Sequence, residues 1–475
     1  MTQEESAQTD AGWGSLFRNG LGIYTVMLNL GIGLHAVDVF IVSTVMPSVV
    51  RDIGGAEFYT WSTMLYMVAS IVGAATGGPM KAWLGARHAY ALGGLLFLAG
   101  SVGCALSPTM AVLLVARTVQ GFGGGLITAM SMSLIGELFP SGLRKRVLAV
   151  VSSTWGIAAL IGPAVGGIFA ELGSWRGAFW INAPVIVAFL LAIWFRLPEQ
   201  GKASSPRLFP YRRMALLTVG VLSVGGASHL PNPPLQAGLI AVAVLLVWAT
   251  LKLDHAGAAK LFPTRPFALS SAVGVGYWVM FLSSMTHTVI GAFLPLALQV
   301  LRGVEPLMAG YMTASLAVCW TLASVATAHL HGRAASIAIM TGQVMCCAGL
   351  AALAFGIETV PTALVPALNG LVGLGLGSSN LHVVAATMRH APSGEESITA
   401  SSIPTIRSLG IAFGAAGAGV VANSAGLTDA LLAPDVARSV LWVLGIGTMA
   451  PLAALLLSSR FIVLIHRDAA RPEPS

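Results

Sequence analysis

Long blocks of apolar residues, separated by short polar segments, follow one another along most of this chain. An apolar block of about 18 or more residues with few charges predicts a membrane-spanning α-helix, because a bilayer core needs roughly 20 residues of helix. The blocks lack the period-two alternation of a membrane β-barrel. The pattern predicts about fourteen spans, at 20–47, 57–80, 86–106, 109–137, 146–171, 175–196, 212–230, 235–253, 268–299, 306–329, 334–356, 361–387, 397–423 and 437–464.

The polar segments and an internal likeness suggest how the spans are grouped. Residues 197–211 are rich in Pro, Gly and Ser, which favours a linker, and glycine-rich stretches recur in the fourth and twelfth spans and in the fifth and thirteenth. We therefore expect an all-α integral membrane protein of two pseudo-symmetric six-helix bundles with an extra central helix pair. The expected parts are an N-terminal tail (1–19), a first bundle (20–196), the linker (197–211), the extra pair (212–253), a loop (254–267), a second bundle (268–464) and a C-terminal tail (465–475).

Composition and charge agree with this reading. Hydrophobic residues make up 56% of the chain and charged residues 9%, whereas a soluble domain has about 25% charged residues. Placing both termini in the cytoplasm puts most Lys and Arg residues inside, as the positive-inside rule demands. The net charge of +7 therefore reflects topology, and no nucleic-acid partner is expected. We expect a multi-pass protein of the plasma membrane, which in this case is the inner membrane of a bacterium. We also expect the protein to function as a monomer.

Two opposite charges fall inside predicted spans of the first half. Asp38 lies nine residues before Pro47, and Arg117 lies about eight residues into a helix that runs inward. At 1.5 Å per residue both lie roughly 12–13 Å below the outer face. Charges at this depth persist only with a partner or a wet cavity, and they are functional by default. The sequence predicts an ion pair or a shared cavity in which Asp38 gains and loses a proton.

His35 lies one helical turn before Asp38 on the same face, so it is a candidate to assist proton handling. Two plainer readings stay open. Asp38 and Arg117 would then only lock two helices together, and His35 would only pack.

The fifth span has a glycine-rich helical face. Gly162 and Gly166 are four residues apart, which lets a neighbouring backbone approach closely, and Pro163 removes one backbone hydrogen bond. With Gly156 and Gly167, these residues predict a gating and packing helix, although packing alone would explain the spacing.

Nucleotide and cofactor chemistry find no support in the pattern. The glycines after Gln120 follow no strand and lie within a span, so they do not predict a dinucleotide site, and a phosphate-binding loop motif does not occur. Transport energy would then come from a gradient, here a proton gradient. Neither a cofactor nor a metal site is expected.

The predicted spans of the second half contain basic residues, but no Asp or Glu lies deep within them. His287 and Arg407 lie inside spans nine and thirteen with no Asp or Glu nearby. A substrate cavity would combine them with aromatic walls for a planar or cationic ligand. The candidate cavity residues are Gln120, Trp155, Tyr277, Trp278, His287, Trp320 and Arg407.

Three ordered motifs resemble those of the major facilitator superfamily, specifically its fourteen-helix drug:proton antiporter branch. Asp38 to Pro47 resembles the first-helix signature, Arg117 to Gly123 the fourth-helix signature, and Gly156 to Gly167 the fifth-helix signature. The resemblance covers nearly the whole chain. It implies two six-helix bundles, alternating access and proton-coupled export of small amphipathic compounds such as drugs or metabolites.

One loop departs from the family pattern. Between Gly78 and Gly85 the usual acidic residue is replaced by Ala82. In the family that carboxylate helps to hold the inner gate shut. Gating here would then depend on Arg87, Glu137 and the basic cluster 144–146.

The function alternatives differ in substrate and energy source. Uptake or uniport of an organic anion by the same fold is the second reading, suggested by Arg117 and Arg407. An enzyme acting on lipids would need clustered acids or histidines at one interface, and we find none in the sequence. A non-transporting receptor is suggested only by the altered inner loop.

Overall fold

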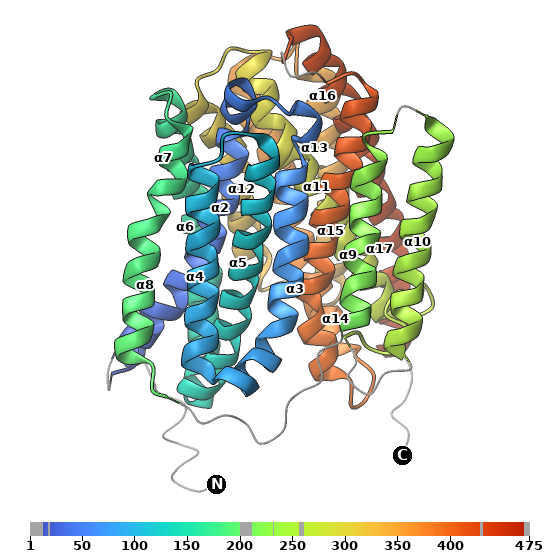
Figure 1. Ribbon diagram of the computed structural model, residues 1–475. Helices are drawn as coiled ribbons and strands as arrows, with labels where there is room; N and C mark the ends of the chain where they lie inside the picture. Colours follow the sequence, from blue (N-terminus) through green and yellow to red (C-terminus); the bar gives the residue numbers. More distant parts are fainter. Residues whose placement is uncertain are drawn as a thin grey trace, which may run out of the picture. The chain divides into compact units, whose positions relative to one another are not determined.

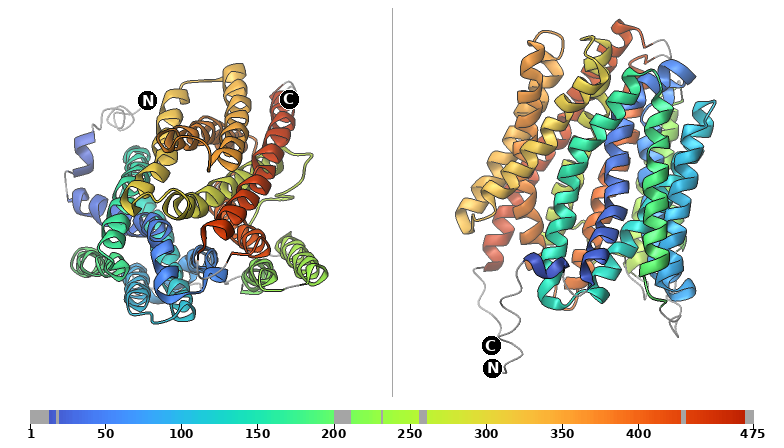
Figure 2. Two further views of the ribbon diagram at one scale, coloured as in Figure 1. Left: turned by 90° about the horizontal axis from the view of Figure 1, so that it is seen from above. Right: turned by 90° about the vertical axis from the view of Figure 1, so that its left-hand side faces the viewer.

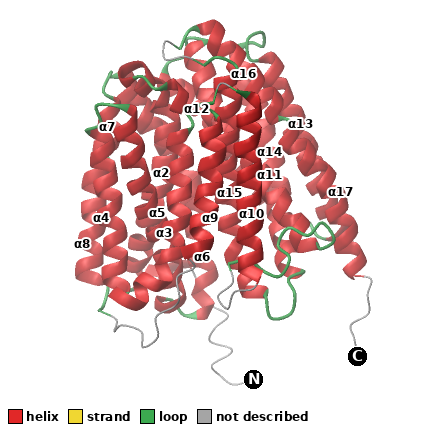
Figure 3. Cartoon of the chain, turned by 45° about the vertical axis from the view of Figure 1, so that its right-hand side comes forward, coloured by secondary structure: helices red, strands yellow, loops and turns green. Residues whose placement is uncertain are grey.

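The computed structural model describes residues 13–17, 20–199, 211–230, 232–255, 261–427 and 431–469. Its regular elements in these ranges are all helices (Figures 1 and 3). Within them, 13 helices are long and apolar enough to cross a membrane. The helix α9 (Tyr211–Ala227) has 17 residues, the lower limit of roughly 17–25 for a span. The all-α membrane fold with about fourteen spans is therefore confirmed.

By internal packing the chain forms two compact units, residues 1–45 with 68–209, and residues 46–67 with 210–475. Parts of the expected tails, linker and loop lie outside the described residues, and the expected domain boundaries stay predictions. The first unit contains most of α2 (Leu21–Ile53) and α3 (Trp61–Leu84), followed by α4 (Ala86–Ala105), α5 (Met110–Leu138), α6 (Ser141–Glu171), α7 (Trp175–Trp180) and α8 (Asn182–Arg196), with η1 (Trp13–Phe17) at its start.

The second unit contains the C-terminal end of α2, the N-terminal end of α3 and the rest of the chain. Its remaining elements are η2 (Ala56–Phe58), α9, α10 (Pro233–His255), α11 (Ala272–Val300), α12 (Pro306–Thr327), α13 (Gly332–Gly356), η3 (Thr362–Leu364), α14 (Val365–Arg389), α15 (Glu396–Ser424), α16 (Ala433–Gly447) and α17 (Met449–Ala469).

Prolines mark four differences from the expected spans. Pro47 and Pro295 lie inside α2 and α11 rather than at their ends, because a membrane helix tolerates the loss of one backbone hydrogen bond. The sixth span is instead broken between α7 and α8, and the last between α16 and α17. Pro184 follows the first of these breaks and Pro451 follows the second. Neither proline has an N–H group to donate a hydrogen bond to the carbonyl oxygen four residues earlier.

Glycines bring the helices of each unit close together. A Cβ atom at Gly125 of α5 would collide with the backbone of Ser70 in α3, and one at Gly377 of α14 with the backbone of Trp320 in α12. Such close contact between backbones is how helices gain packing energy in a lipid environment. Contacts of this kind hold α5 against α3 in the first unit and α14 against α12 in the second.

The extra pair α9 and α10 lies side by side in the views of Figures 1 and 2 and packs together. Arg213 of α9 donates to Asp254 of α10 (2.5 Å). Asp254 also accepts from the backbone N–H groups of Leu261 (2.8 Å) and Phe262 (2.9 Å). One buried carboxylate thus ties both helices to the segment that follows them.

Candidate functional site

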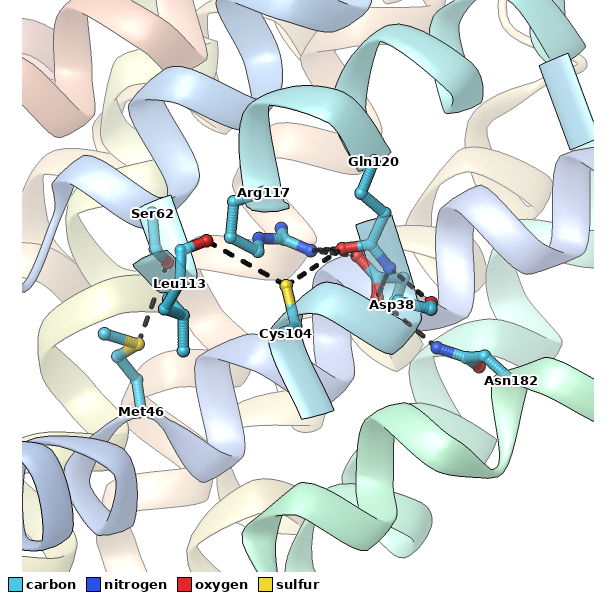
Figure 4. A network of polar contacts seen from close by, with 9 residues as sticks. Asp38, Met46, Ser62, Cys104, Leu113, Arg117, Gln120 and Asn182 are labelled. Carbon is cyan, nitrogen blue, oxygen red and sulfur yellow. Dashed lines mark hydrogen bonds and ion pairs between the residues drawn. The ribbon is translucent and has the colours of Figure 1, made fainter. Parts of the chain in front are cut away.

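Two helices of the first unit bring Asp38 and Arg117 into direct contact. Arg117 Nη1 donates to Asp38 Oδ2 at 2.5 Å. Asp38 is 0% exposed and Arg117 is 1% exposed. The predicted proximity of the two charges is confirmed, in the form of a buried ion pair. Figure 4 shows the two side chains pointing toward one another from α2 and α5.

Gln120 joins this pair from one turn further along α5. Its Oε1 accepts from Arg117 Nη1 (2.6 Å), and its Nε2 donates to Asp38 Oδ1 (2.8 Å) and to Ser101 Oγ (2.8 Å). Both ends of the amide are therefore committed. The structure places Gln120 inside the charge network, and its predicted role in a substrate cavity stays a prediction.

Three further residues around the pair were not singled out from the sequence. Ser101 and Cys104 come from α4, where Cys104 Sγ lies 3.8 Å from Gln120 Oε1. Asn182, the first residue of α8, points its Nδ2 at Asp38 Oδ1 from 3.5 Å (Figure 4). The sequence signal that could have identified such residues is a polar side chain within an apolar span, because a polar group without a hydrogen-bond partner is costly in a membrane.

The network surrounds the carboxyl group of Asp38 with hydrogen-bond donors. A buried ion pair must recover the cost of desolvating both ions through geometry and additional hydrogen bonds, and here the two carboxylate oxygens both have partners. Removing one partner of such a pair typically costs about 3–5 kcal/mol. The site thus combines one carboxyl group, one guanidinium and one amide in a single buried network, and proton exchange at Asp38 stays a prediction.

The helix α6 packs tightly against the segment of α2 that carries Asp38. A Cβ atom at Gly162 would collide with Phe40 Cβ and lie 3.0 Å from Val37 O, and one at Gly166 would lie 2.9 Å from Ile41 O. The expected close approach of a neighbouring backbone is thus confirmed, and that neighbour is α2. Despite Pro163, α6 is one helix from Ser141 to Glu171, and Gly156 and Gly167 lie within it.

His35 and Trp155 meet beside the pair. The ring of His35 stands edge-on to that of Trp155, with 6.0 Å between centroids. His35 is buried, whereas Trp155 is 40% exposed. Their roles in proton coupling and in a substrate cavity stay predictions.

Near the turn between α3 and α4, the described residues of the first unit form two ion pairs. Glu137 of α5 pairs with Lys81 of α3, and Arg87 of α4 pairs with Glu199 (3.1 Å) and lies over the Trp194 ring. Sequence reasoning named Arg87 and Glu137 but missed Lys81, which lies next to the altered position Ala82. Gly78 lies in α3. Gly85 has a φ of 83°, a left-handed conformation that glycine adopts readily, at the turn between α3 and α4.

In the same region Arg144, from the basic cluster 144–146, donates to the carbonyl oxygens of Phe139 (3.0 Å) and Gly136 (2.6 Å). It therefore holds the end of α5 to the start of α6. The gating roles proposed for these residues stay predictions.

The remaining predicted cavity residues lie in the second unit. Arg407 Nη2 donates to Asn380 Oδ1 (2.8 Å), and the His287 ring stands edge-on to Trp320 (6.0 Å between centroids). The structure thus places Arg407 beside an amide, a partner that sequence reasoning did not name. Their contact with a substrate stays a prediction.

Tyr277 and Trp278 are held by neighbouring backbone. The Tyr277 hydroxyl bonds to Thr399 O (2.8 Å) and Ser402 Oγ (2.6 Å), and Trp278 Nε1 donates to Phe267 O (3.1 Å). Both residues therefore fasten α11 to its neighbours.

The second unit has no counterpart of the charged pair at the equivalent place. A Cβ atom at Gly123 of α5 would approach Gly93 O, and one at Gly375 of α14 would collide with Gly342 O, so the two glycines occupy matching positions. Arg117 lies six residues before Gly123, and Asn369 lies six residues before Gly375. Asn369 therefore has the position in the second unit that Arg117 has in the first. Asn369 Nδ2 donates to Met312 O (3.2 Å) and Thr313 O (2.8 Å) of α12.

Among the described residues, no group of three or more His, Cys, Asp or Glu side chains is placed to hold a metal ion.

Many long apolar helices and a buried ion pair define a polytopic membrane protein. Residues 28–415 match the family model of the Major Facilitator Superfamily. The chain belongs to this superfamily, as predicted, and it is a membrane transporter rather than an enzyme. A small-molecule substrate and a lipid environment follow from that membership.

Relatives in sequence cover most of the chain. A probable multidrug-efflux transporter of Mycobacterium tuberculosis (strain H37Rv) is 34% identical over 443 residues, which is 89% of this chain and 92% of that protein. The multidrug transporter protein MdtP of Bacillus subtilis (strain 168) is 27% identical over 414 residues, covering 84% of this chain and 75% of that protein.

Solved structures share the fold at low identity. A D-xylose–proton symporter has a TM-score of 0.65 and 16% identity, covering 92% of this chain and 97% of that one. A POT family transporter has a TM-score of 0.64 and 14% identity, covering 92% of this chain and 96% of that one. At such identity the likeness concerns the fold alone.

Proposed function

We propose that the protein exports small amphipathic compounds, such as drugs or metabolites, in exchange for protons by alternating access. The observation that carries this proposal is the buried Asp38–Arg117 pair with its Gln120 bridge. The multidrug-efflux names of relatives in Mycobacterium and Bacillus support the substrate class and direction.

Protonation of Asp38 would change the energy of the whole site. With Asp38 ionised, the pair is neutral as a unit. With Asp38 protonated, the Arg117 charge is no longer compensated, and an uncompensated charge within a membrane costs at least about 2.5 kcal/mol. The helices then favour an arrangement in which water or another group reaches Arg117. A ligand that binds one arrangement better shifts the same equilibrium, which couples export to proton entry.

Reconstitution into liposomes with an internal pH dye tests the proposal. Lipophilic cations and neutral amphiphiles are added, and proton movement is followed for the native protein and for Asp38→Asn. We expect substrate-dependent proton movement that is lost in Asp38→Asn. Proton movement unaffected by this substitution would remove the antiport mechanism.

The matched control is Asp254→Asn, which also weakens a buried ion pair, with Arg213. Because Asp254 lies in the extra helix pair, we expect this variant to be less stable and to keep substrate-driven proton movement. Equal loss of coupling in both variants would mean that general damage to the fold explains the Asp38 result.

A second candidate, uptake or uniport of an organic anion, is favoured by one observation. Arg407 is paired with the amide of Asn380 and not with an acid, so its positive charge can pair with an anionic group. Movement of aromatic carboxylates without any pH signal, reduced in Arg407→Gln, would support this candidate over proton exchange.

The proposal includes protons as the coupling ion, a monomer as the working unit, and a bacterial inner membrane with both termini in the cytoplasm. The excess of Lys and Arg in the loops assigned to the inside supports that orientation.

A further inference from the structure

The amide of Asn182 is the least constrained group that contacts Asp38. Its contact with Asp38 Oδ1 is 3.5 Å long, compared with 2.8 Å for Gln120 and 2.5 Å for Arg117. Asn182 is nevertheless buried, with 4% of its surface exposed. Buried amides normally have hydrogen-bond partners, so a buried amide with one long contact calls for an explanation.

A protonated Asp38 needs an acceptor that its close neighbours do not offer. The new O–H group on Oδ1 must donate to some lone pair, since a buried donor without a partner costs about 1–3 kcal/mol. Arg117 has donors only. The oxygen of Gln120 has two lone pairs and accepts from Arg117 and from the thiol of Cys104, and its nitrogen is held between Asp38 and Ser101.

We propose that Asn182 is a positioning residue that presents its Nδ2 to ionised Asp38 and, after its amide turns over, its Oδ1 to protonated Asp38. The step adds one proton to Asp38 Oδ1 from water and breaks no other covalent bond. An asparagine amide offers a donor and an acceptor at nearly the same place, so half a turn about one bond is enough. This inference rests on the proposed proton chemistry of Asp38.

The fold places this amide through the break between α7 and α8. Because Pro184 cannot donate to the carbonyl of Trp180, the helix is interrupted at Ile181, and Asn182 begins α8 beside α2 (Figure 4). The titratable or charged groups that face Asp38 from other elements are Arg117 on α5 and Cys104 on α4, and His35 lies one turn before Asp38 on α2 itself. The stretch of α6 packed on α2, residues 158–167, has none.

Infrared difference spectroscopy during a pH titration of the purified protein tests the proposal without requiring transport. The C=O stretch of protonated Asp38 is the band that disappears in Asp38→Asn. The matched variants are Asn182→Val and Asn182→Thr, which have nearly the same shape and differ in one hydroxyl group. A hydroxyl can both donate and accept.

In Asn182→Val we expect the midpoint of the Asp38 band to fall by about one pH unit, because the protonated form loses its acceptor while the ionised form keeps its two short hydrogen bonds. Asn182→Thr should restore the native midpoint. Asn29→Val is the control, since its amide bonds to Thr25 O and Thr154 Oγ1, and it should leave the midpoint unchanged.

A midpoint in Asn182→Val that equals the native one, or lies above it, would overturn the role of Asn182 and leave proton exchange by Asp38 intact. The absence of any Asp38 band in the native protein at every pH would overturn this inference together with the proposed function.

Discussion

At the scale of single residues, the site depends on amide groups as much as on charges. Gln120 contacts Arg117, Asp38 and Ser101 at once, so it fixes how the two ions face each other. A charge pair of this kind is worth most when its geometry is held by such additional bonds. The chemistry of Asp38 is therefore a property of the network rather than of one carboxylate.

Replacing Gln120 with leucine tests this view. Gln120→Leu keeps the side-chain volume but removes the acceptor for Arg117 and a donor to Asp38, with a cost of about 1–3 kcal/mol for each buried group left without a partner. We expect at least about a tenfold loss of substrate-driven proton movement in liposomes. Thr118→Val is the control, because the Thr118 hydroxyl bonds only within its own helix, to Leu114 O. Equal activity of the two variants would contradict the prediction.

At the scale of helices, backbone contact at glycine determines which elements can meet. Gly125 brings α5 against α3, and Gly166 brings α6 against α2. The ion pair of Asp38 and Arg117 itself joins α2 to α5. The sequence spacing predicted close approach at Gly162 and Gly166 but could not identify the partner helix.

The substitution Gly125→Ala should destabilise the protein, since the added methyl group would collide with the backbone of Ser70. Overpacking of this kind costs about 1–3 kcal/mol, measured as a lower midpoint of thermal unfolding in detergent. On the same helix, a methyl group at Gly136 would meet nothing within 4 Å, so Gly136→Ala should leave the midpoint unchanged or slightly raised. A similar response at both positions would show that close packing at Gly125 is not required.

At the scale of the whole molecule, the two units share a packing plan but differ in charge. Each is built around a glycine-rich helix, α5 or α14, yet only the first has an Arg at the position that Asn369 occupies in the second. The buried ion pair is therefore a feature of the first unit, while Arg407 and Asn380 give the second a different polar site.

The extra helix pair offers a test at this scale. Asp254→Ala removes the partner of Arg213 and the acceptor for two backbone N–H groups, so we expect a loss of about 3–5 kcal/mol. Hydrogen exchange should then be faster in α9 and α10. By contrast Glu199→Ala removes an exposed partner of Arg87, and a loss of at most about 1 kcal/mol is expected. Unchanged exchange in Asp254→Ala would show that the pair does not depend on this carboxylate.

The sequence by itself determined the membrane environment and the helical class, and it singled out Asp38 and Arg117 as charges that need a partner. These features follow from local composition and from the cost of a charge in hydrocarbon, which act along a single helix. Only the tertiary structure decided that Gln120, Ser101 and Asn182 complete the Asp38 network, and that Lys81 pairs with Glu137. Those partners lie far apart in the chain, and their contacts depend on which helices pack together, on helix rotation and on the break at Ile181.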